Sequence, residues 1–325
     1  MSYRKKLVFL LSLISALALV YALSLVFDPE RTGTRSAAYT WLDPKLAGGI
    51  IRIRISESGD TRELVKKNSQ WFILHNGRDY PARALRVEDF IGILTKRAAY
   101  PLRSSSPSSH QRLGLTEDTA AAITVYGTNT PARGQAELPL LDLLAGYEDN
   151  TGREIYLRRR GQNEVRSGDS SIISYIAGSH NFWYNLRLIP ESENGGLDAD
   201  DVQRLTVYGS EDTQPQVFSR WNREWSLSGL TIANPDIIKI DAYVRSILNT
   251  EGDDFDDSID SEDSLFNYSR IVLELGDGSV RTIRLSQPDE TGRCFAAVDG
   301  CEYVYSLSGW AAQRLFKTAA DFEKQ

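Results

Sequence analysis

The chain has 325 residues with 37 Lys and Arg against 44 Asp and Glu, a formal net charge of −7, and is 41% hydrophobic and 25% charged. This balance is typical of a globular protein, and it excludes a disordered chain and a strongly basic nucleic-acid binder. The chain contains only two cysteines, which excludes a disulfide-dense scaffold. Its length is sufficient for two domains, each with its own core.

An apolar run from Leu7 to Phe27, broken only by three serines, follows a short basic N-terminal tail. As a helix, these 21 residues would rise about 31 Å, enough to cross the hydrocarbon core of a bilayer. Because the basic flank precedes the run, we expect the N-terminus to stay in the cytoplasm and the chain from Asp28 onward to lie outside. A cleaved signal peptide is the alternative, although its apolar core would be shorter.

Beyond residue 28, the sequence predicts an internal duplication. Trp71 and Trp225 stand 154 residues apart, each at the start of a strand-like run, and the same offset maps Pro81 onto Pro235. Two further pairs share this offset, Ile93 with Ile247 and Leu94 with Leu248. A single domain with coincidental tryptophan spacing is the alternative.

Each copy is expected to begin with a half-buried strand of alternating apolar residues. These are Ile51, Ile53 and Ile55 in the first copy and Val202, Leu205 and Val207 in the second. An amphipathic helix is expected to follow the tryptophan strand. Its apolar residues are Val87, Phe90, Ile91 and Leu94 in the first copy, and Ile240, Tyr243, Val244, Ile247 and Leu248 in the second. Further strands at 123–127 and 271–276, D-x-T-G-R segments at 149–153 and 289–293, and closing helices at 170–177 and 308–316 complete the two copies.

These elements predict an α+β protein, with an N-terminal transmembrane helix followed by two duplicated, mainly antiparallel α+β units. The expected division is a basic tail and anchor at 1–27, a linker at 28–47, the first unit at 48–180, a connector at 181–198, the second unit at 199–318 and a tail at 319–325. A Ser/Pro segment at 103–110 and an acidic run at 251–264 are expected to be mobile surface loops.

The sequence contains no motif that indicates an enzyme. His75, His110 and His180 lack metal-ligand spacing, and neither a phosphate-binding loop nor a nucleophile elbow is present. A calcium loop starting at Asp253 would have Ser258 at its sixth position, where glycine is required. We therefore expect no catalytic site, no metal and no cofactor, while a hydrolase site assembled from distant residues stays open as a third hypothesis.

Cys294 and Cys301 flank Asp299-Gly300, a strong hairpin-turn pair, and form a candidate disulfide if this part of the chain lies outside the cytoplasm. Two free cysteines are the alternative, because a turn centred there would place Val298 opposite Cys301.

Three of the six tryptophans are expected in the core, and the pattern gives no clear place to the other three, Trp41, Trp183 and Trp221. Trp71, Trp225 and Trp310 stand on amphipathic elements and are expected in the core. Trp183 and Tyr184 are expected to be exposed and to contact a partner protein.

The order of strand, tryptophan strand and helix resembles the domain-of-unknown-function family 4340. The residues that carry this resemblance are Ile51, Ile53, Trp71, Ile73, Pro81, Ala82, Val87, Ile91, Leu94 and Leu113-Gly114-Leu115. The stretch 182–186 is similar to the hydrophobic connection that leads into the second copy. The chain departs from the pattern at Arg83, where the family has an acidic residue.

The resemblance implies a bacterial protein of the cytoplasmic membrane, single-pass, with most of the chain on the extracytoplasmic side. It also implies association with ABC transporters of the gliding-motility type, and it attaches no enzymatic activity. We expect a non-enzymatic accessory subunit of an ABC-type transporter or envelope complex, whose partners are permease or auxiliary subunits and not nucleic acid. The alternative is an envelope protein that binds a peptide or glycan between its two repeats.

Overall fold

The computed structural model describes residue 17 and residues 38–128, 137–190, 197–209, 214–222, 224–228, 236–317 and 319–324. The chain divides into two compact units, Met1–Trp183 and Tyr184–Gln325. Apart from Leu17, the apolar run predicted to cross the membrane lies outside the described residues. Within those residues, no helix has both the length and the apolar character that spanning a bilayer requires.

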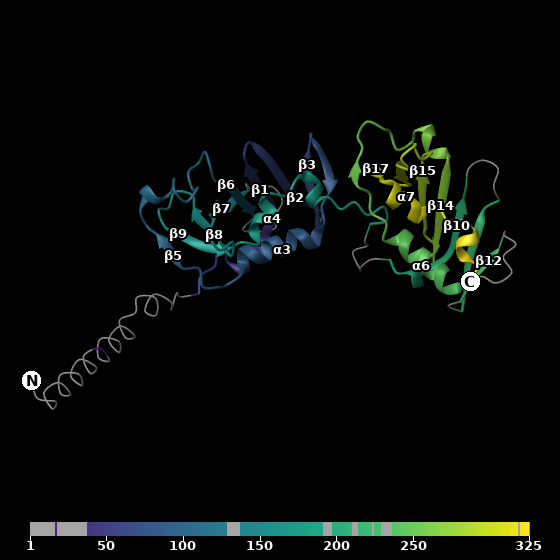
Figure 1. The fold of residues 1–325 in the computed structure, drawn as a ribbon, viewed down its shortest axis with the longest axis horizontal. Helices are drawn as coiled ribbons and strands as arrows, with labels where there is room; N and C mark the ends of the chain where they lie inside the picture. The colour runs from purple at the N-terminus through teal and green to yellow at the C-terminus, as the bar shows by residue number, and fades with distance from the viewer. Residues whose placement is uncertain are drawn as a thin grey trace, which may run out of the picture. The chain divides into compact units, whose positions relative to one another are not determined.

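The first unit is a nine-stranded antiparallel sheet with helices packed against it (Figure 1). The strand order is β4-β3-β2-β1-β6-β7-β8-β9-β5. The strands are β1 (Ile50–Glu57), β2 (Asp60–Lys67), β3 (Gln70–His75), β4 (Arg78–Pro81), β5 (Leu102–Ser104), β6 (Ala121–Gly127), β7 (Leu138–Glu148), β8 (Glu154–Arg159) and β9 (Val165–Asp169). The helices are α3 (Ala84–Thr95), α4 (Ile172–Ile176) and α5 (His180–Trp183), with 3-10 turns η1 (Pro44–Gly49) and η2 (Pro107–Ser109).

The second unit is an eight-stranded antiparallel sheet with the order β12-β11-β10-β14-β15-β16-β17-β13. The strands are β10 (Val202–Tyr208), β11 (Gln216–Trp221), β12 (Glu224–Ser228), β13 (Asp254–Phe255), β14 (Ser269–Leu275), β15 (Val280–Leu285), β16 (Cys294–Val298) and β17 (Val304–Leu307). The helices are α6 (Ile237–Leu248) and α7 (Gly309–Leu315), with 3-10 turns η3 (Ala199–Asp201), η4 (Ser264–Asn267) and η5 (Ala319–Phe322).

The two sheets have the same order of corresponding strands. From β3 to β5, each strand of the first sheet has a counterpart at the same position in the second, and only β4 has none among the described residues. The central pairs also share an irregularity, because the register shifts between Ile50 and Arg52 in one sheet and between Val202 and Arg204 in the other. These sheets confirm the predicted α+β class with antiparallel pairing.

The register shift changes which residues of the first strand are buried. Ile53 and Ile55 are buried as predicted, but the third buried isoleucine is Ile50, whereas Ile51 is only half-buried. A bulge adds one residue to a strand and so reverses the alternation beyond it. The prediction for Ile51 is therefore wrong.

The amphipathic helices supply one layer of each core. In α3 the buried residues are Val87, Phe90 and Leu94, and in α6 all five predicted apolar residues are buried. The tryptophans on the neighbouring strands, Trp71 and Trp225, are buried as expected. Helical spacing puts these side chains on one face, and burying that face against the sheet provides most of the stability of such helices.

The two D-x-T-G-R segments form the same turn. Asp149 Oδ1 accepts hydrogen bonds from the Thr151 hydroxyl (3.0 Å) and the Arg153 amide (3.1 Å). In the second unit, Asp289 Oδ1 accepts from the Thr291 hydroxyl (2.7 Å) and the Arg293 amide (2.9 Å). These bonds, led by the one from the threonine hydroxyl, lower the pKa of each aspartate.

Both segments expected to be loops contain a short edge strand. In the first unit β5 pairs with β9, and in the second unit the acidic run contains β13, which pairs with β17. The loop prediction is therefore wrong for Arg103, Ser104, Asp254 and Phe255. Backbone pairing at a sheet edge leaves side chains in water, so a polar composition does not prevent it.

Candidate functional site

A polar hollow lies beside the turn η3 in the second unit. It has a volume of about 260 Å³ and is lined by Asp200, Gln203, Arg220 and Asn222, which we call the η3 hollow. All four side chains end in a planar group that donates or accepts hydrogen bonds, namely a carboxylate, a guanidinium and two amides. Such a set can orient a small polar ligand.

The local sequence fixes the turn that forms one wall of the hollow. Asp198 caps η3 by accepting a hydrogen bond from the Ala199 amide (2.6 Å), while the Asp201 side chain accepts from the Asp198 amide (2.8 Å). This reciprocal arrangement is a capping box, which satisfies donors that the start of a helical turn leaves unpaired.

Arg220 joins this turn to the sheet. Its side chain is only 9% exposed, and its guanidinium donates to the Ala199 carbonyl (2.7 Å) and forms an ion pair with Asp200. The guanidinium also lies 5.5 Å from the centre of the Trp225 ring, on the residue that opposes Arg220 across β11 and β12. Stacking on an aromatic face and donating through both terminal nitrogens fix a guanidinium in one orientation.

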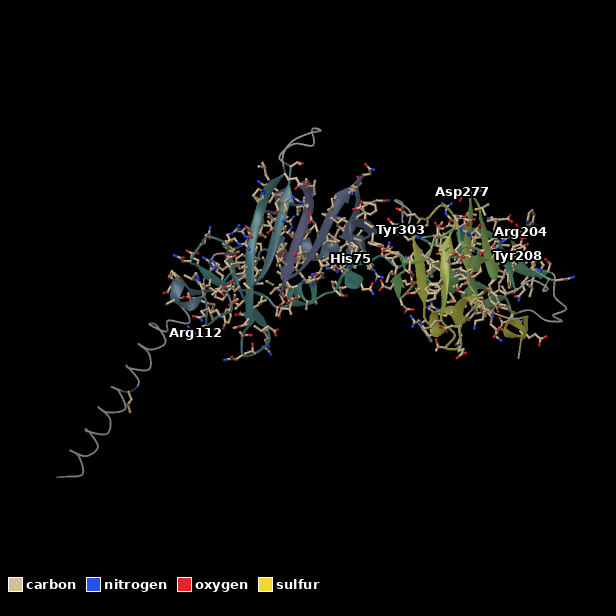
Figure 2. All side chains as sticks on the ribbon, turned by 90° about the horizontal axis from the view of Figure 1, so that it is seen from above. His75, Arg112, Arg204, Tyr208, Asp277 and Tyr303 are labelled. Carbon is tan, nitrogen blue, oxygen red and sulfur yellow. The ribbon has the colours of Figure 1, made fainter. Side chains whose placement is uncertain are left out.

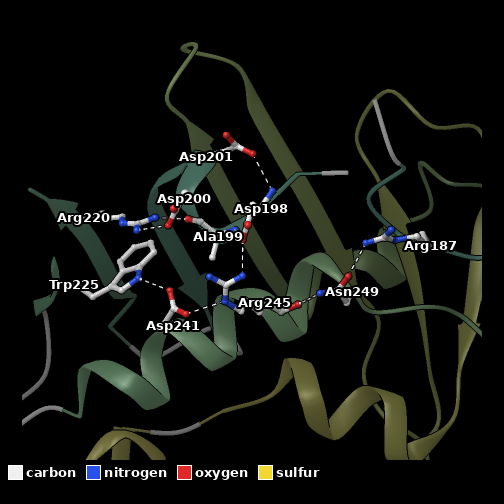
Figure 3. Close-up of polar contacts among 10 residues, drawn as sticks. All are labelled: Arg187, Asp198, Ala199, Asp200, Asp201, Arg220, Trp225, Asp241, Arg245 and Asn249. Atoms are coloured by element: carbon white, nitrogen blue, oxygen red, sulfur yellow. Dashed lines mark hydrogen bonds and ion pairs between the residues drawn. The ribbon is translucent and has the colours of Figure 1, made fainter. Parts of the chain in front are cut away.

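A chain of polar contacts then links η3 to α6 (Figure 3). Trp225 Nε1 donates to Asp241 (3.4 Å), Arg245 Nε pairs with Asp241 (2.9 Å), and Arg245 Nη1 pairs with Asp198 (2.5 Å). Asp241 and Arg245 are four residues apart, so they lie on one face of the helix. The hydrogen bond to Asp241, together with the charges of both aspartates, raises the pKa of Arg245.

Asn222, which also lines the hollow, lies in the β11–β12 turn. Asn222 has a φ of +49° there, a conformation that asparagine tolerates better than most residues. Asn68, at the matching turn of the first unit, has a φ of +48°. The asparagine therefore has nearly the same backbone φ in the two turns.

The side chains around the matching turn of the first unit differ. Lys66 stands over Trp71 (5.7 Å) where Arg220 stands over Trp225, and Ile51 occupies the bulge position of Gln203. Only one of the two units therefore combines the guanidinium with the polar bulge residue.

The two units also differ in charge. Residues 38–183 contain 19 Lys and Arg against 16 Asp and Glu, a net charge of +3. Residues 184–325 contain 13 against 26, a net charge of −13. The hollow therefore lies in a unit whose overall field is strongly negative.

The candidate disulfide is not formed in the structure, in which Cys294 and Cys301 are both free. Cys294 lies on β16 opposite Leu307, whereas Cys301 lies in the turn that follows β16, with its sulfur 3.7 Å from the Tyr305 hydroxyl. The Asp299-Gly300 turn forms where the sequence predicts it. Because the turn pairs Cys301 with Val298, Cys294 is not opposite Cys301.

The expected exposure of Trp183 and Tyr184 is wrong, because they are 0% and 4% exposed. Trp183 packs against Phe90 and Phe182, and Tyr184 packs against Phe255. Neither side chain presents a surface to a partner.

Trp310 is the converse case, because it is 71% exposed on α7 although a core position was predicted. Arg314, one turn along the helix, lies 5.0 Å from the centre of its ring. Trp221, between two residues of the hollow, is 79% exposed.

His75, which is labelled in Figure 2, belongs to the first unit. Its ring stacks on that of His180, far away in the sequence, with the ring centres 4.0 Å apart. His180 begins α5, and burial, followed by the positive charge that His75 can carry, lowers its pKa. His110 lies elsewhere, against the Asn163 carbonyl. Over the described part of the chain, no group of three or more His, Cys, Asp or Glu side chains is placed to hold a metal ion.

None of the four residues of the hollow stands out in the sequence on its own. Two local signals point to their support, the Asp198-x-x-Asp201 spacing of a capping box and the Asp241-x-x-x-Arg245 pair on the predicted helix. A comparison of the two copies adds a third signal, because Gln203 replaces an apolar residue at a matching position.

The protein therefore consists of two consecutive antiparallel α+β units whose corresponding strands have the same order in the sheet. The chain belongs to the family described as Domain of unknown function (DUF4340), which matches residues 71–265. This match confirms the family resemblance. No match is found among curated proteins, and none is found among solved structures.

Proposed function

We propose that this protein is a non-enzymatic accessory subunit of an ABC-type transporter or another envelope complex, anchored in the bacterial cytoplasmic membrane by the run Leu7–Phe27. Its N-terminus lies inside, and both sheet units lie on the extracytoplasmic side. Its partners are permease or auxiliary subunits of that complex. The family resemblance and the basic flank of the apolar run support this assignment.

The observation that carries the proposal is the way the chain joins the first unit directly after the apolar run. Tyr39 exchanges two backbone hydrogen bonds with Ala98 (2.9 and 3.1 Å), and the Leu42 amide donates to the Leu94 carbonyl (2.9 Å). Residues 28–38 separate the apolar run from Tyr39 in the sequence, and that number of residues can span at most about 40 Å. With the anchor in the membrane, the first unit begins within about 40 Å of the membrane surface, within reach of the other subunits of a membrane complex.

The charge difference between the units supports the same arrangement. An anionic lipid surface repels a unit with a net charge of −13 and does not repel one with a net charge of +3. In the sequence, the near-neutral first unit comes directly after the proposed anchor segment, and the acidic second unit comes after the first. The acidic unit is then kept from lying on the lipid and is available to a protein.

Affinity purification from a mild detergent tests this proposal. We expect the full-length protein to recover permease or auxiliary subunits of one transporter, identified by mass spectrometry, and a version lacking residues 1–27 to recover far less of them. Recovery of the full-length protein without any membrane transport subunit would contradict the proposal.

A second candidate is an envelope protein that binds a peptide or a glycan, and the η3 hollow favours it. It is lined by four polar side chains, and two of them, Asp200 and Arg220, are held by the contacts drawn in Figure 3, which is the kind of arrangement that a polar ligand needs. Saturable binding of a small molecule by the protein purified without partners would favour this candidate.

A further inference from the structure

We propose that the η3 hollow binds a neutral saccharide, with one sugar ring held by Asp200, Gln203, Arg220 and Asn222. This inference concerns the second unit alone and does not depend on the accessory-subunit function. It rests on three properties of the hollow, which are its support, its charge and its hydrogen-bonding groups.

The support of the hollow exceeds what stability requires. Exposed ion pairs contribute little to the free energy of unfolding, with a median of about 0–1 kcal/mol. Yet Arg220 and Arg245 connect a three-residue turn to both the sheet and α6, and Trp225 and Asp241 complete the chain of contacts. Side chains that fix their neighbours in this way are typical of a preorganised binding site.

The charge of the hollow disfavours ionic ligands. Arg220 is already paired with Asp200, so the two charges lining the hollow compensate each other. An anion would have to displace Asp200 and enter a unit with a net charge of −13, and a cation would face the guanidinium of Arg220. A neutral ligand meets neither obstacle.

The remaining lining groups match hydroxyls. Gln203 and Asn222 each offer an amide with two donors and one acceptor oxygen, and a sugar hydroxyl is itself both donor and acceptor. An apolar ligand would leave these groups unpaired. A peptide that binds by adding a strand needs a free sheet edge. Gln203 and Arg220 lie on β10 and β11, and each of these strands is already paired on both sides.

Tryptophan signals provide the test. The full-length protein is labelled with ¹⁵N-tryptophan in a zwitterionic detergent without sugar headgroups, and its indole N–H resonances are followed by NMR. The probes are the tetramer of N-acetylglucosamine, maltotetraose, tetra-alanine and inorganic phosphate. We expect at least one of the two saccharides to shift the resonances of Trp221 and Trp225, which adjoin Arg220, and to leave exposed Trp310 unchanged.

Matched variants assign the binding to the hollow. Gln203→Ala combined with Asn222→Gly removes both amides from the hollow, and we expect it to weaken saccharide binding at least about tenfold. Asn68→Gly makes the same change at the matching turn of the first unit and should alter the Kd less than about twofold.

Three results would overturn the inference. One is the absence of any shift with both saccharides at about 10 mM, where a site with a Kd of about 1 mM would be nine-tenths filled. Another is a shift with tetra-alanine or phosphate alone, which would assign the hollow to a different ligand. The third is saccharide binding that the double variant and Asn68→Gly affect equally.

Discussion

Arg62 and Gln216 occupy matching positions in the two sheets, and each hydrogen-bonds to the end of the corresponding helix in its own unit, α4 or α7. Arg62 Nη1 donates to the carbonyls of Ile176 (2.5 Å) and Gly178 (2.6 Å) at the end of α4. Gln216 Nε2 donates to the Lys317 carbonyl (3.2 Å) beyond the end of α7. Arg62 lies on β2 and Gln216 on β11, and both side chains donate to carbonyls at or just beyond the end of a helix. The first unit uses a charged group for this task and the second a neutral one.

We expect Arg62→Ala to lower the free energy of unfolding of the first unit by about 2–4 kcal/mol, because it leaves two carbonyls unsatisfied inside the protein. Gln216→Ala should cost about 1 kcal/mol, since it removes one neutral hydrogen bond. Urea denaturation followed by tryptophan fluorescence measures both. Arg54→Ala is the control, because Arg54 lies on the same sheet with a more exposed side chain. Equal effects of Arg62→Ala and Arg54→Ala would contradict the bracing role of Arg62.

The glycines of the first unit give a second prediction. A Cβ on Gly146 would lie 2.2 Å from the Leu113 carbonyl oxygen, so Gly146→Ala should destabilise the protein by about 2 kcal/mol or more. Gly92 lies in α3 with open space around it, and Gly92→Ala should stabilise the protein by about 0.5–1 kcal/mol. Thermal unfolding measures both changes, and a gain in stability from Gly146→Ala would show that β7 does not pass beside Leu113 as described.

The same contact explains part of the family pattern. Leu113-Gly114-Leu115 looks like an ordinary loop in the sequence, but Gly114 has a φ of +68° and Leu115 is buried against Leu144 and Val165. The ring of Tyr147 packs against Gly114, and a Cβ at this position would lie 2.9 Å from the ring carbons. The motif is therefore the point where a loop meets the sheet.

The histidine pair predicts a pH dependence. Burial and the neighbouring His75 lower the pKa of His180, outweighing the opposite effect of Asp60. The folded chain therefore takes up a proton at His180 less readily than the unfolded chain, and this contribution to stability is complete above the ordinary value of about 6.5. As the pH falls through the lower, folded-state pKa, the contribution is lost.

We expect the urea midpoint to decrease from about pH 7.5 to about pH 5, and His180→Asn to reduce that decrease. His110→Asn is the matched control, because His110 lies away from the pair, and it should leave the slope unchanged. An identical pH dependence for the two variants would refute the role of the stacked pair.

The two thiols should differ in reactivity. Burial, assisted by the negative charge of Asp289, raises the pKa of Cys294 to about 11, so few of these thiols ionise near neutral pH. We expect iodoacetamide at about pH 8 to modify Cys301 in the native protein and to reach Cys294 only after denaturation. Peptide mass spectrometry measures this. If neither thiol reacts in denaturant without reductant, the two cysteines are bonded and the turn differs from the one described.

The elements that could be predicted from the sequence are those with a regular apolar period. The residues of α6 follow helical spacing throughout, so their burial is fixed by local pattern. The Trp225 strand alternates in the sequence, whereas Trp71 begins a short continuous apolar run, which also predicts a strand. The prediction that Ile51 is buried fails because a bulge depends on the pairing with the neighbouring strand, which the apolar period of one strand does not reveal. Trp183 and Trp310 fail because a single aromatic residue is equally compatible with a core and a surface position until its neighbours are known.

The candidate site could be predicted only in part. Asp198 and Asp201 have capping-box spacing in the sequence, but Arg220 reaches the turn only because β11 pairs with β10. The stacking of His75 on His180 likewise depends on the packing of α5 against β3. Contacts between distant segments are determined by the sheet topology, which no local pattern specifies.

Thiol labelling in spheroplasts tests the proposal that both units lie outside the cytoplasm on an N-terminal anchor. A membrane-impermeant maleimide is added before or after lysis, and modification of Cys301 is measured; a Ser2→Cys variant reports on the cytoplasmic side. We predict that Cys301 is modified before lysis and that the cysteine at position 2 is modified only after it. Modification of Cys301 only after lysis would place the sheet units in the cytoplasm and contradict the proposed orientation in the membrane.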